Sequence, residues 1–233
     1  MLNVNLLSTK VLPDDLVQAF IKKKINLRQK DFIDVQLDYN ARSFKARLNN
    51  PSSQARVFTS KNALFSLQKL ADEEGIEFHR KKNFVVGIRA TELLQDFGQR
   101  VDVKSGNAIS LAQIIARNKD IKEVDYFCGD KALEDIPEYL SSKGIKVNKE
   151  VVYRTSMVAH EVEYLMLHAV MFFSPSSVFS YFKRNRLKLE TMVFTIGATT
   201  ADAVKLKCNN SIILADEPSI PSTVKKVIEH YRS

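Results

Sequence analysis

The sequence predicts an α/β protein built from two similar small domains. Short apolar runs with the composition of strands alternate along the 233 residues with stretches whose apolar residues recur at helical spacing. The second observation is an internal repeat, because VFTSKNALFSLQKL (57–70) has the same design as FFSPSSVFSYFKRN (172–185). In this alignment Ser60 corresponds to Ser174 and Ser66 to Ser180. Two copies of one strand-to-helix junction indicate a repeated unit and a repeated site.

The elements of the first half follow from their apolar patterns. Residues 4–8 (VNLLS) form a short apolar strand, and the next helix begins at Pro13, where Asp14 and Asp15 favour a helix start. The remaining pattern predicts strands at 56–60 (RVFTS) and 83–88 (NFVVGI), helices at 63–74 and 91–97, and a loop followed by a helix in 105–118 (SGNAISLAQIIARN).

The second half repeats this alternation. Pro137 falls in the first turns of its helix, where a proline costs least. His160 and His168 are eight residues apart on a predicted helix, but no third ligand is evident, so a metal site is not expected. The elements are strands at 124–130 (VDYFCGD), 169–174 (AVMFFS) and 192–197 (MVFTIG), each before a helix, and an extended segment at 145–155 (IKVNKEVVYRT).

The glycines lie at junctions between these elements. Gly75, Gly98 and Gly144 each follow a helix and precede an apolar segment, as helix C-caps do. The others fall where a helix is about to begin, where a missing side chain lets backbone N–H groups approach a ligand. These are Gly87, Gly106, Gly129 and Gly197.

The internal repeat extends over four quarters. They cover about 4–38, 56–117, 124–158 and 170–230, in the order A–B–A′–B′. The domains could be tandem pairs, or a continuous central domain with an outer domain formed from both chain ends. The second arrangement needs two crossings, at 31–39 and 150–158, which could pair as a two-stranded hinge. Periodicity does not choose between these pairings.

Composition limits the classes of function. The net charge of +8 favours an anionic partner, although basic residues on solvated helix faces explain most of the excess of positive charge. The chain lacks tryptophan and a long basic tail, so a nucleic-acid partner is not expected. No apolar run could span a membrane, and MLNVNLLSTK does not have the pattern of a signal peptide. Cys128 and Cys208 lie far apart, which argues against a zinc site or disulfide framework and favours a reducing cytoplasm.

Several motifs together resemble the uroporphyrinogen-III synthases. FFSPSSV, IGATTADAV and EPSIPSTV resemble the C-terminal part of that family. VFTSKNA, VVG, SGNAISLA, CGD and VVYRT fall in the family's order and spacing, so that the match covers roughly 55–230.

The resemblance implies a fold and a reaction. It implies two α/β domains with parallel sheets, 1–35 with 158–233 and 36–157, joined by a two-stranded β hinge, with the active-site cleft between them. It implies a cytoplasmic, monomeric lyase of tetrapyrrole (haem) biosynthesis that needs no cofactor or metal. This enzyme would cyclise hydroxymethylbilane to uroporphyrinogen III with loss of water and inversion of ring D. The alternative is a non-catalytic two-domain protein that binds an anionic polycarboxylate.

Substrate binding is expected at the strand-to-helix junctions, where hydroxyl groups and free N–H groups suit carboxylates. Family members commonly have proline at the position of Lys61, and Thr91 stands one position later than the family's loop threonine, so both depart from the pattern. Asp130 would repel a carboxylate and is expected to cap its own helix. The candidates are Ser60, Lys61, Asn62, Gly87, Thr91, Gly106, Asn107, Gly129, Ser174, Ser176, Ser177, Thr199 and Thr200.

The catalytic candidate is Tyr153, which aligns with the family's hinge tyrosine. A phenol with a pKa near 10 is protonated at neutral pH and could act as a general acid toward the departing hydroxyl of the bilane. The plain alternative is a tyrosine that only packs and bonds to the backbone. Cys128 precedes a helix but has no basic neighbour, so a small core residue is expected there.

Overall fold

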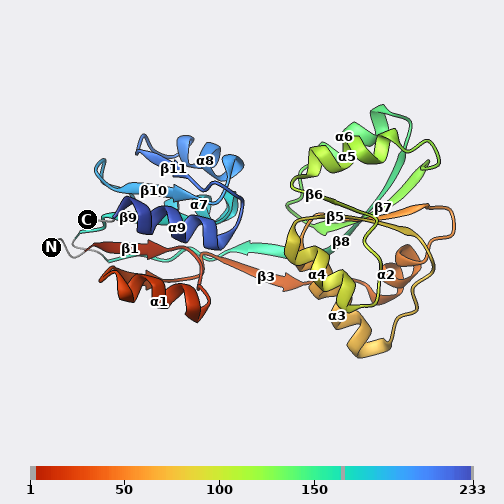
Figure 1. The fold of residues 1–233 in the computed structure, drawn as a ribbon, viewed down its shortest axis with the longest axis horizontal. Helices are drawn as coiled ribbons and strands as arrows, with labels where there is room; N and C mark the ends of the chain where they lie inside the picture. Colours follow the sequence, from red (N-terminus) through yellow and green to blue (C-terminus); the bar gives the residue numbers. More distant parts are fainter. Residues whose placement is uncertain (1–3, 164–165, 232–233) are drawn as a thin grey trace. The chain divides into compact units, whose positions relative to one another are not determined.

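The computed structural model describes residues 4–163 and 166–231, and the chain divides into two compact units. Unit 1 is formed by Met1–Asp34 together with Ser156–Ser233, and unit 2 by the continuous segment Val35–Thr155. Each unit has one sheet covered by helices (Figure 1), which confirms the predicted α/β class with two sheets whose strands are mostly parallel.

Unit 1 has a five-stranded sheet in the order β11-β10-β9-β1-β2, and all its strand pairs are parallel. Apolar residues of α1 and α9 pack in one core cluster with Leu6 and Phe194, and those of α7 and α8 pack in a second with Leu7 and Val193. Neighbouring residues of a strand face opposite sides, so the helices cover both faces. The elements are β1 (Asn5–Ser8), α1 (Asp14–Lys22), β2 (Asn26–Gln29), β9 (Ala169–Phe172), α7 (Pro175–Phe182), β10 (Met192–Thr195), α8 (Ala198–Lys205), β11 (Ile212–Leu214) and α9 (Ile220–His230).

Unit 2 has a six-stranded sheet in the order β3-β8-β7-β4-β5-β6. Helices α2, α3 and α4 pack with Phe58 and Phe127 on one face, and α5 and α6 pack with Val57 and Cys128 on the other. Its elements are β3 (Ile33–Leu37), α2 (Ala41–Leu48), β4 (Ala55–Phe58), α3 (Lys61–Glu74), β5 (Lys82–Val86), α4 (Ile88–Asp96), β6 (Val103–Ser105), α5 (Ala108–Arg117), β7 (Glu123–Gly129), α6 (Asp135–Ser142) and β8 (Lys146–Met157).

The two segments predicted to carry the chain across are β3 and β8. They are neighbours in the sheet of unit 2, which confirms that they pair. The unit boundaries, Asp34/Val35 and Thr155/Ser156, both fall within these strands.

The helix predicted around His160 and His168 is wrong. Residues 158–163 and 166–168 have no regular structure, and 164–165 lie outside the described residues. Each histidine instead serves the packing of unit 1. His160 bonds through Nε2 to the Asp31 carbonyl oxygen at 2.9 Å, and Nδ1 of His168 accepts from the Asn5 N–H at 3.0 Å.

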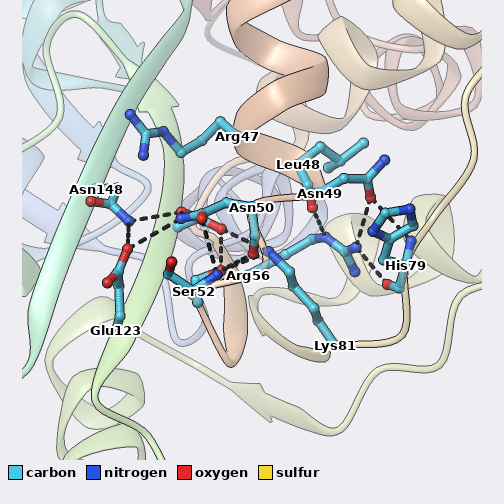
Figure 2. A network of polar contacts seen from close by, with 12 residues as sticks. Arg47, Leu48, Asn49, Asn50, Ser52, Arg56, His79, Lys81, Glu123 and Asn148 are labelled. Carbon is cyan, nitrogen blue, oxygen red and sulfur yellow. Dashed lines mark hydrogen bonds and ion pairs between the residues drawn. The ribbon is translucent and has the colours of Figure 1, made fainter.

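A buried polar network lies at the amino ends of the strands of unit 2 (Figure 2). Lys81 and Asp125, with side chains 5% and 0% exposed, form an ion pair of 3.0 Å. Burial lowers the pKa of Lys81, and the hydrogen bond to Asp125 opposes this shift. Arg56 donates to the carbonyl oxygens of Leu48 at 2.8 Å and His79 at 2.7 Å. The basic HRKK segment at 79–82 is therefore partly a structural anchor and not only a solvated face.

Candidate active site in unit 2

The carboxyl ends of β4, β5, β6 and β7 lie at one edge of the unit 2 sheet, because these strands are parallel. Two helices that start at this edge have side-chain caps. Ser60 caps α3 by accepting from the Asn62 N–H at 3.1 Å, and Asn107 caps α5 by accepting from the Ser110 N–H at 2.8 Å. The structure thus brings several predicted site residues to one edge, with the positive ends of their helices there.

The loop at Gly87 uses its polar groups internally. Gly87 has a positive φ of 87° and is the N-cap of α4. Its N–H donates to the Ser105 carbonyl oxygen at 3.0 Å, so this N–H is not available to a ligand, contrary to expectation. Thr91 donates its hydroxyl back to the Gly87 carbonyl oxygen at 3.0 Å. The threonine that stands one position late in this loop therefore bonds with its hydroxyl to the N-cap of α4, the helix in which it lies.

The expected capping role of Asp130 is wrong. Helix α6 begins only at Asp135, and Asp130 instead accepts from the Thr155 N–H at 2.9 Å. The Asp130 N–H donates to the Tyr153 carbonyl oxygen at 3.1 Å, so the end of β7 and the middle of β8 are tied together in both directions. Burial acts to raise the pKa of Asp130, but Thr155, Lys131 and Arg154 outweigh it and lower that pKa.

Tyr153 lies directly over Gly129. A Cβ atom built on Gly129 would be 2.4 Å from both Cε2 and Cζ of the Tyr153 ring. The glycine is therefore required for space, because any side chain would occupy the position of the ring. Burial raises the pKa of Tyr153, and hydrogen bonding to Ser60 and to the Gly129 backbone acts in the opposite direction. The phenol is protonated at neutral pH, as a general acid requires.

Tyr153 and Ser60 line a pocket of about 250 Å³ within unit 2. Its wall combines polar and apolar side chains, as the walls of ligand pockets commonly do. Leu133, which is 64% exposed, is the most prominent apolar side chain. The complete lining is Thr59, Ser60, Ala108, Tyr126, Lys131, Ala132, Leu133, Asp135, Ile136, Tyr153 and Thr155.

Sequence reasoning missed a second phenol in this pocket. The hydroxyl groups of Tyr126 and Thr59 are 3.0 Å apart, and burial raises the pKa of Tyr126. Thr59 directly precedes Ser60, and Tyr126 lies in the predicted strand VDYFCGD, which also contains Gly129. Their positions next to candidate residues are the signal in the sequence that could have identified them. The expected core role of Cys128 is confirmed, because its thiol is buried and burial raises its pKa to about 11.

The other candidates of unit 2 are less enclosed. Lys61 is exposed, and its ammonium group lies 6.0 Å from the centroid of the Phe65 ring. Gly106 directly precedes the cap residue Asn107, and a Cβ atom there would meet nothing within 4 Å.

Unit 1 has its own capped junctions. Ser174 accepts from the Ser177 N–H at 3.1 Å, and the buried Ser177 hydroxyl donates to the Ser174 carbonyl oxygen at 2.8 Å. Ser176, in the first turn of α7, is half-buried. In the first turn of α8, Thr199 is exposed while Thr200 is buried. Ser177 and Thr200 thus have mainly structural surroundings, and the accessible candidates of this unit are Ser174, Ser176 and Thr199.

Among the residues that the structure describes, no group of three or more histidine, cysteine or acidic side chains could hold a metal ion. Within 4–163 and 166–231, no helix is long and apolar enough to cross a membrane.

Comparisons with known proteins agree with this architecture. Among solved structures the chain is similar to a uroporphyrinogen-III synthetase from Helicobacter pylori, with 16% identity, a TM-score of 0.67 and coverage of 97% of this chain and 99% of that one. It is also similar to a mutant uroporphyrinogen III synthase from Thermus thermophilus, with 12% identity, a TM-score of 0.70 and coverage of 98% of each chain. A search of curated proteins finds no match.

At these identities the structural likeness shows the fold, and the family assignment rests on a separate finding. The family model described as Uroporphyrinogen-III synthase HemD matches residues 35–225, which is most of the 233-residue chain. The resemblance carried by the junction motifs is thereby confirmed. The chain belongs to the uroporphyrinogen-III synthase family.

Proposed function

We propose that the chain cyclises hydroxymethylbilane to uroporphyrinogen III. The observation that carries the proposal is a protonated phenol, Tyr153, lining a pocket beside the N-cap serine Ser60. The raised pKa of Tyr153 keeps the proton on the phenol at neutral pH. Family membership supplies the class of reaction, and the pocket supplies a donor suited to its first step.

In the proposed reaction Tyr153 donates its proton to the terminal hydroxyl of the bilane, which leaves as water. The electrophilic azafulvene that remains closes onto the other end of the chain with ring D inverted. The proton released when the pyrrole is restored returns to the phenolate, so the net change is the loss of one water molecule and no cofactor is consumed. A general acid of this kind contributes about 10²- to 10⁴-fold to a rate.

The substrate carries an acetate and a propionate on every pyrrole, and these carboxylates need positive partners. The helix starts at Ser60 and Asn107 and the side chain of Lys131 would provide them in unit 2. Ser176 and Thr199 provide the same chemistry in unit 1. The net charge of +8 favours association with such a polyanion. We further propose that the protein acts as a monomer.

The test supplies freshly generated hydroxymethylbilane to the purified protein and measures the ratio of type III to type I uroporphyrin after oxidation. Dominant type III product is expected, because spontaneous closure gives type I. Tyr153→Phe should reduce the rate of type III formation without abolishing it, because the pocket still holds the bilane. Type I alone from folded protein would refute the enzyme and leave a non-catalytic polycarboxylate-binding protein, for which bilane binding can be measured by calorimetry.

A further inference from the structure

The pairing of β7 with β8 is irregular next to Tyr153. Cys128 pairs with Val151, but the next residue of β7, Gly129, pairs with Tyr153. Val152 is therefore an extra residue in β8, which defines a β-bulge. Bulges redirect side chains and are common beside active sites.

The bulge decides the face on which Tyr153 lies. In β7, Tyr126 and Cys128 face the α5 and α6 side, and Phe127 faces the α3 side. Strict alternation in β8 would place Val152 on the α3 side and return Tyr153 to the opposite side. The structure packs both Val152 and Tyr153 against the α3 side. Without the bulge the ring could not lie over Gly129.

A side-chain hydroxyl group binds the carbonyl group of the bulged residue. Ser66, on α3, donates to the Val152 carbonyl oxygen at 2.7 Å, and both residues are 0% exposed. The Ser66 hydroxyl also lies 3.1 Å from the Asn62 carbonyl oxygen, which is the bond that a helical serine makes by default. It has one proton, and the shorter contact is the one to the bulge. The Asp38 N–H also donates to the Val152 oxygen, at the longer distance of 3.3 Å, so Ser66 is the closer of these two donors.

We propose that Ser66 is a positioning residue for Tyr153: its hydroxyl fixes the bulge at Val152, and the bulge places the phenol over Gly129 and at the pocket. The catalytic part of this inference rests on the proposed function. The positional part does not, because it concerns only contacts within unit 2.

The internal repeat provides a matched control. Ser180 corresponds to Ser66 in the alignment of the two junctions and is likewise 0% exposed. Its hydroxyl has no hydrogen-bond partner within the described part of the chain. Removing the Ser180 hydroxyl therefore removes a similar buried oxygen from a similar helix without releasing a strand.

The experiment compares Ser66→Ala with Ser180→Ala in the full chain, using protein labelled with ¹³Cζ-tyrosine. The Tyr153 resonance is assigned by its absence in Tyr153→Phe. We expect Ser66→Ala to shift or broaden this resonance and to lower kcat about tenfold with little change in KM, since a displacement of about 1 Å can cost up to roughly 100-fold. Ser180→Ala should leave both the resonance and kcat as in the unmodified protein.

The outcomes distinguish the positioning role of Ser66 from the catalytic role of Tyr153. An unchanged Tyr153 resonance in folded Ser66→Ala would overturn the positioning role whatever the activity. A shifted resonance, together with Tyr153→Phe that retains full turnover, would support the positioning role and refute the catalytic role of Tyr153. If Ser66→Ala does not fold, Ser66→Cys takes its place, because it retains a weak donor of similar size, and it should still shift or broaden the Tyr153 resonance; an unchanged resonance would again overturn the proposal.

Discussion

Replacing Gly129 by alanine should separate activity from stability. The new Cβ atom would lie 2.4 Å from two ring carbons of Tyr153 and 2.8 Å from its hydroxyl oxygen. Ordinary contacts between such atoms begin near 3.4 Å, so the ring must retreat by about 1 Å. The atoms that clash are at the far end of a side chain with rotatable bonds, and overpacking of this kind typically costs about 1–3 kcal/mol. We expect a stability loss toward the low end of that range.

The same displacement should act much more strongly on catalysis. A shift of about 1 Å in a positioned group can reduce a rate by up to about 100-fold. Urea unfolding would measure the free energy of unfolding, and the bilane assay would measure kcat for type III formation. The double variant Gly129→Ala/Tyr153→Phe should lose no more activity than Tyr153→Phe alone, because both changes act through one hydroxyl group.

Gly106→Ala places a Cβ atom in open space, so it should leave the Tyr153 resonance and the free energy of unfolding unchanged. If Gly129→Ala leaves the resonance and kcat at their original values, the close approach of ring and glycine does not position the phenol. Losses of activity that simply add in the double variant would likewise show that the two changes act through separate groups.

Three further predictions concern unit 2. Lys81→Met should destabilise the protein by about 3–5 kcal/mol in chemical unfolding, because it leaves Asp125 charged and buried. The double variant Lys81→Met/Asp125→Leu should recover much of that loss. Equal stability of the single and double variants would contradict this prediction. Ser60→Ala should cost about 1 kcal/mol through loss of the α3 cap, measured in the same way. Hydrogen bonds, of which the one from Asn148 has the largest effect, lower the pKa of Glu123 in the folded protein. The stability that Glu123 contributes is therefore present above the pKa of the unfolded chain, about 4.3, and is lost as the pH falls below that value. Glu123→Gln should therefore lose less stability than the original protein between pH 6 and pH 3, and an identical acid dependence would refute this role.

The alternation of elements could be predicted because most strands and helices have strong local patterns. Three of the elements that were not predicted lack such patterns. Helix α2 (Ala41–Leu48) buries only Phe44 and Leu48 and depends on the Asn40 cap, while β6 (Val103–Ser105) and β11 (Ile212–Leu214) are three residues each. The helix expected near His160 is absent from 158–163 and 166–168, where Val162 and Leu167 instead pack against a core cluster of unit 1.

The candidate site divides in the same way. Ser60 and Tyr153 carry signals in the sequence itself, a capped junction and a tyrosine in an extended segment. The roles of Gly129 and Ser66 depend on a one-residue shift between two strands, which leaves no local pattern in either strand. Asp130 was misplaced because its partner, Thr155, is distant in sequence and becomes adjacent only through that pairing.

The division of unit 1 between both ends of the chain has a consequence for its synthesis. Strand β1 pairs with β2 on one side and with β9 on the other, and β9 begins at Ala169, 140 residues after β2 ends at Gln29. At about 5–20 residues per second, translation leaves that edge of β1 unpaired for roughly 7 to 28 seconds. The continuous unit 2 is complete before the second half of unit 1 exists and can fold first. Nascent chains are therefore most exposed to aggregation through β1, and mutations that slow the folding of unit 1 should reduce yield more than those that slow unit 2.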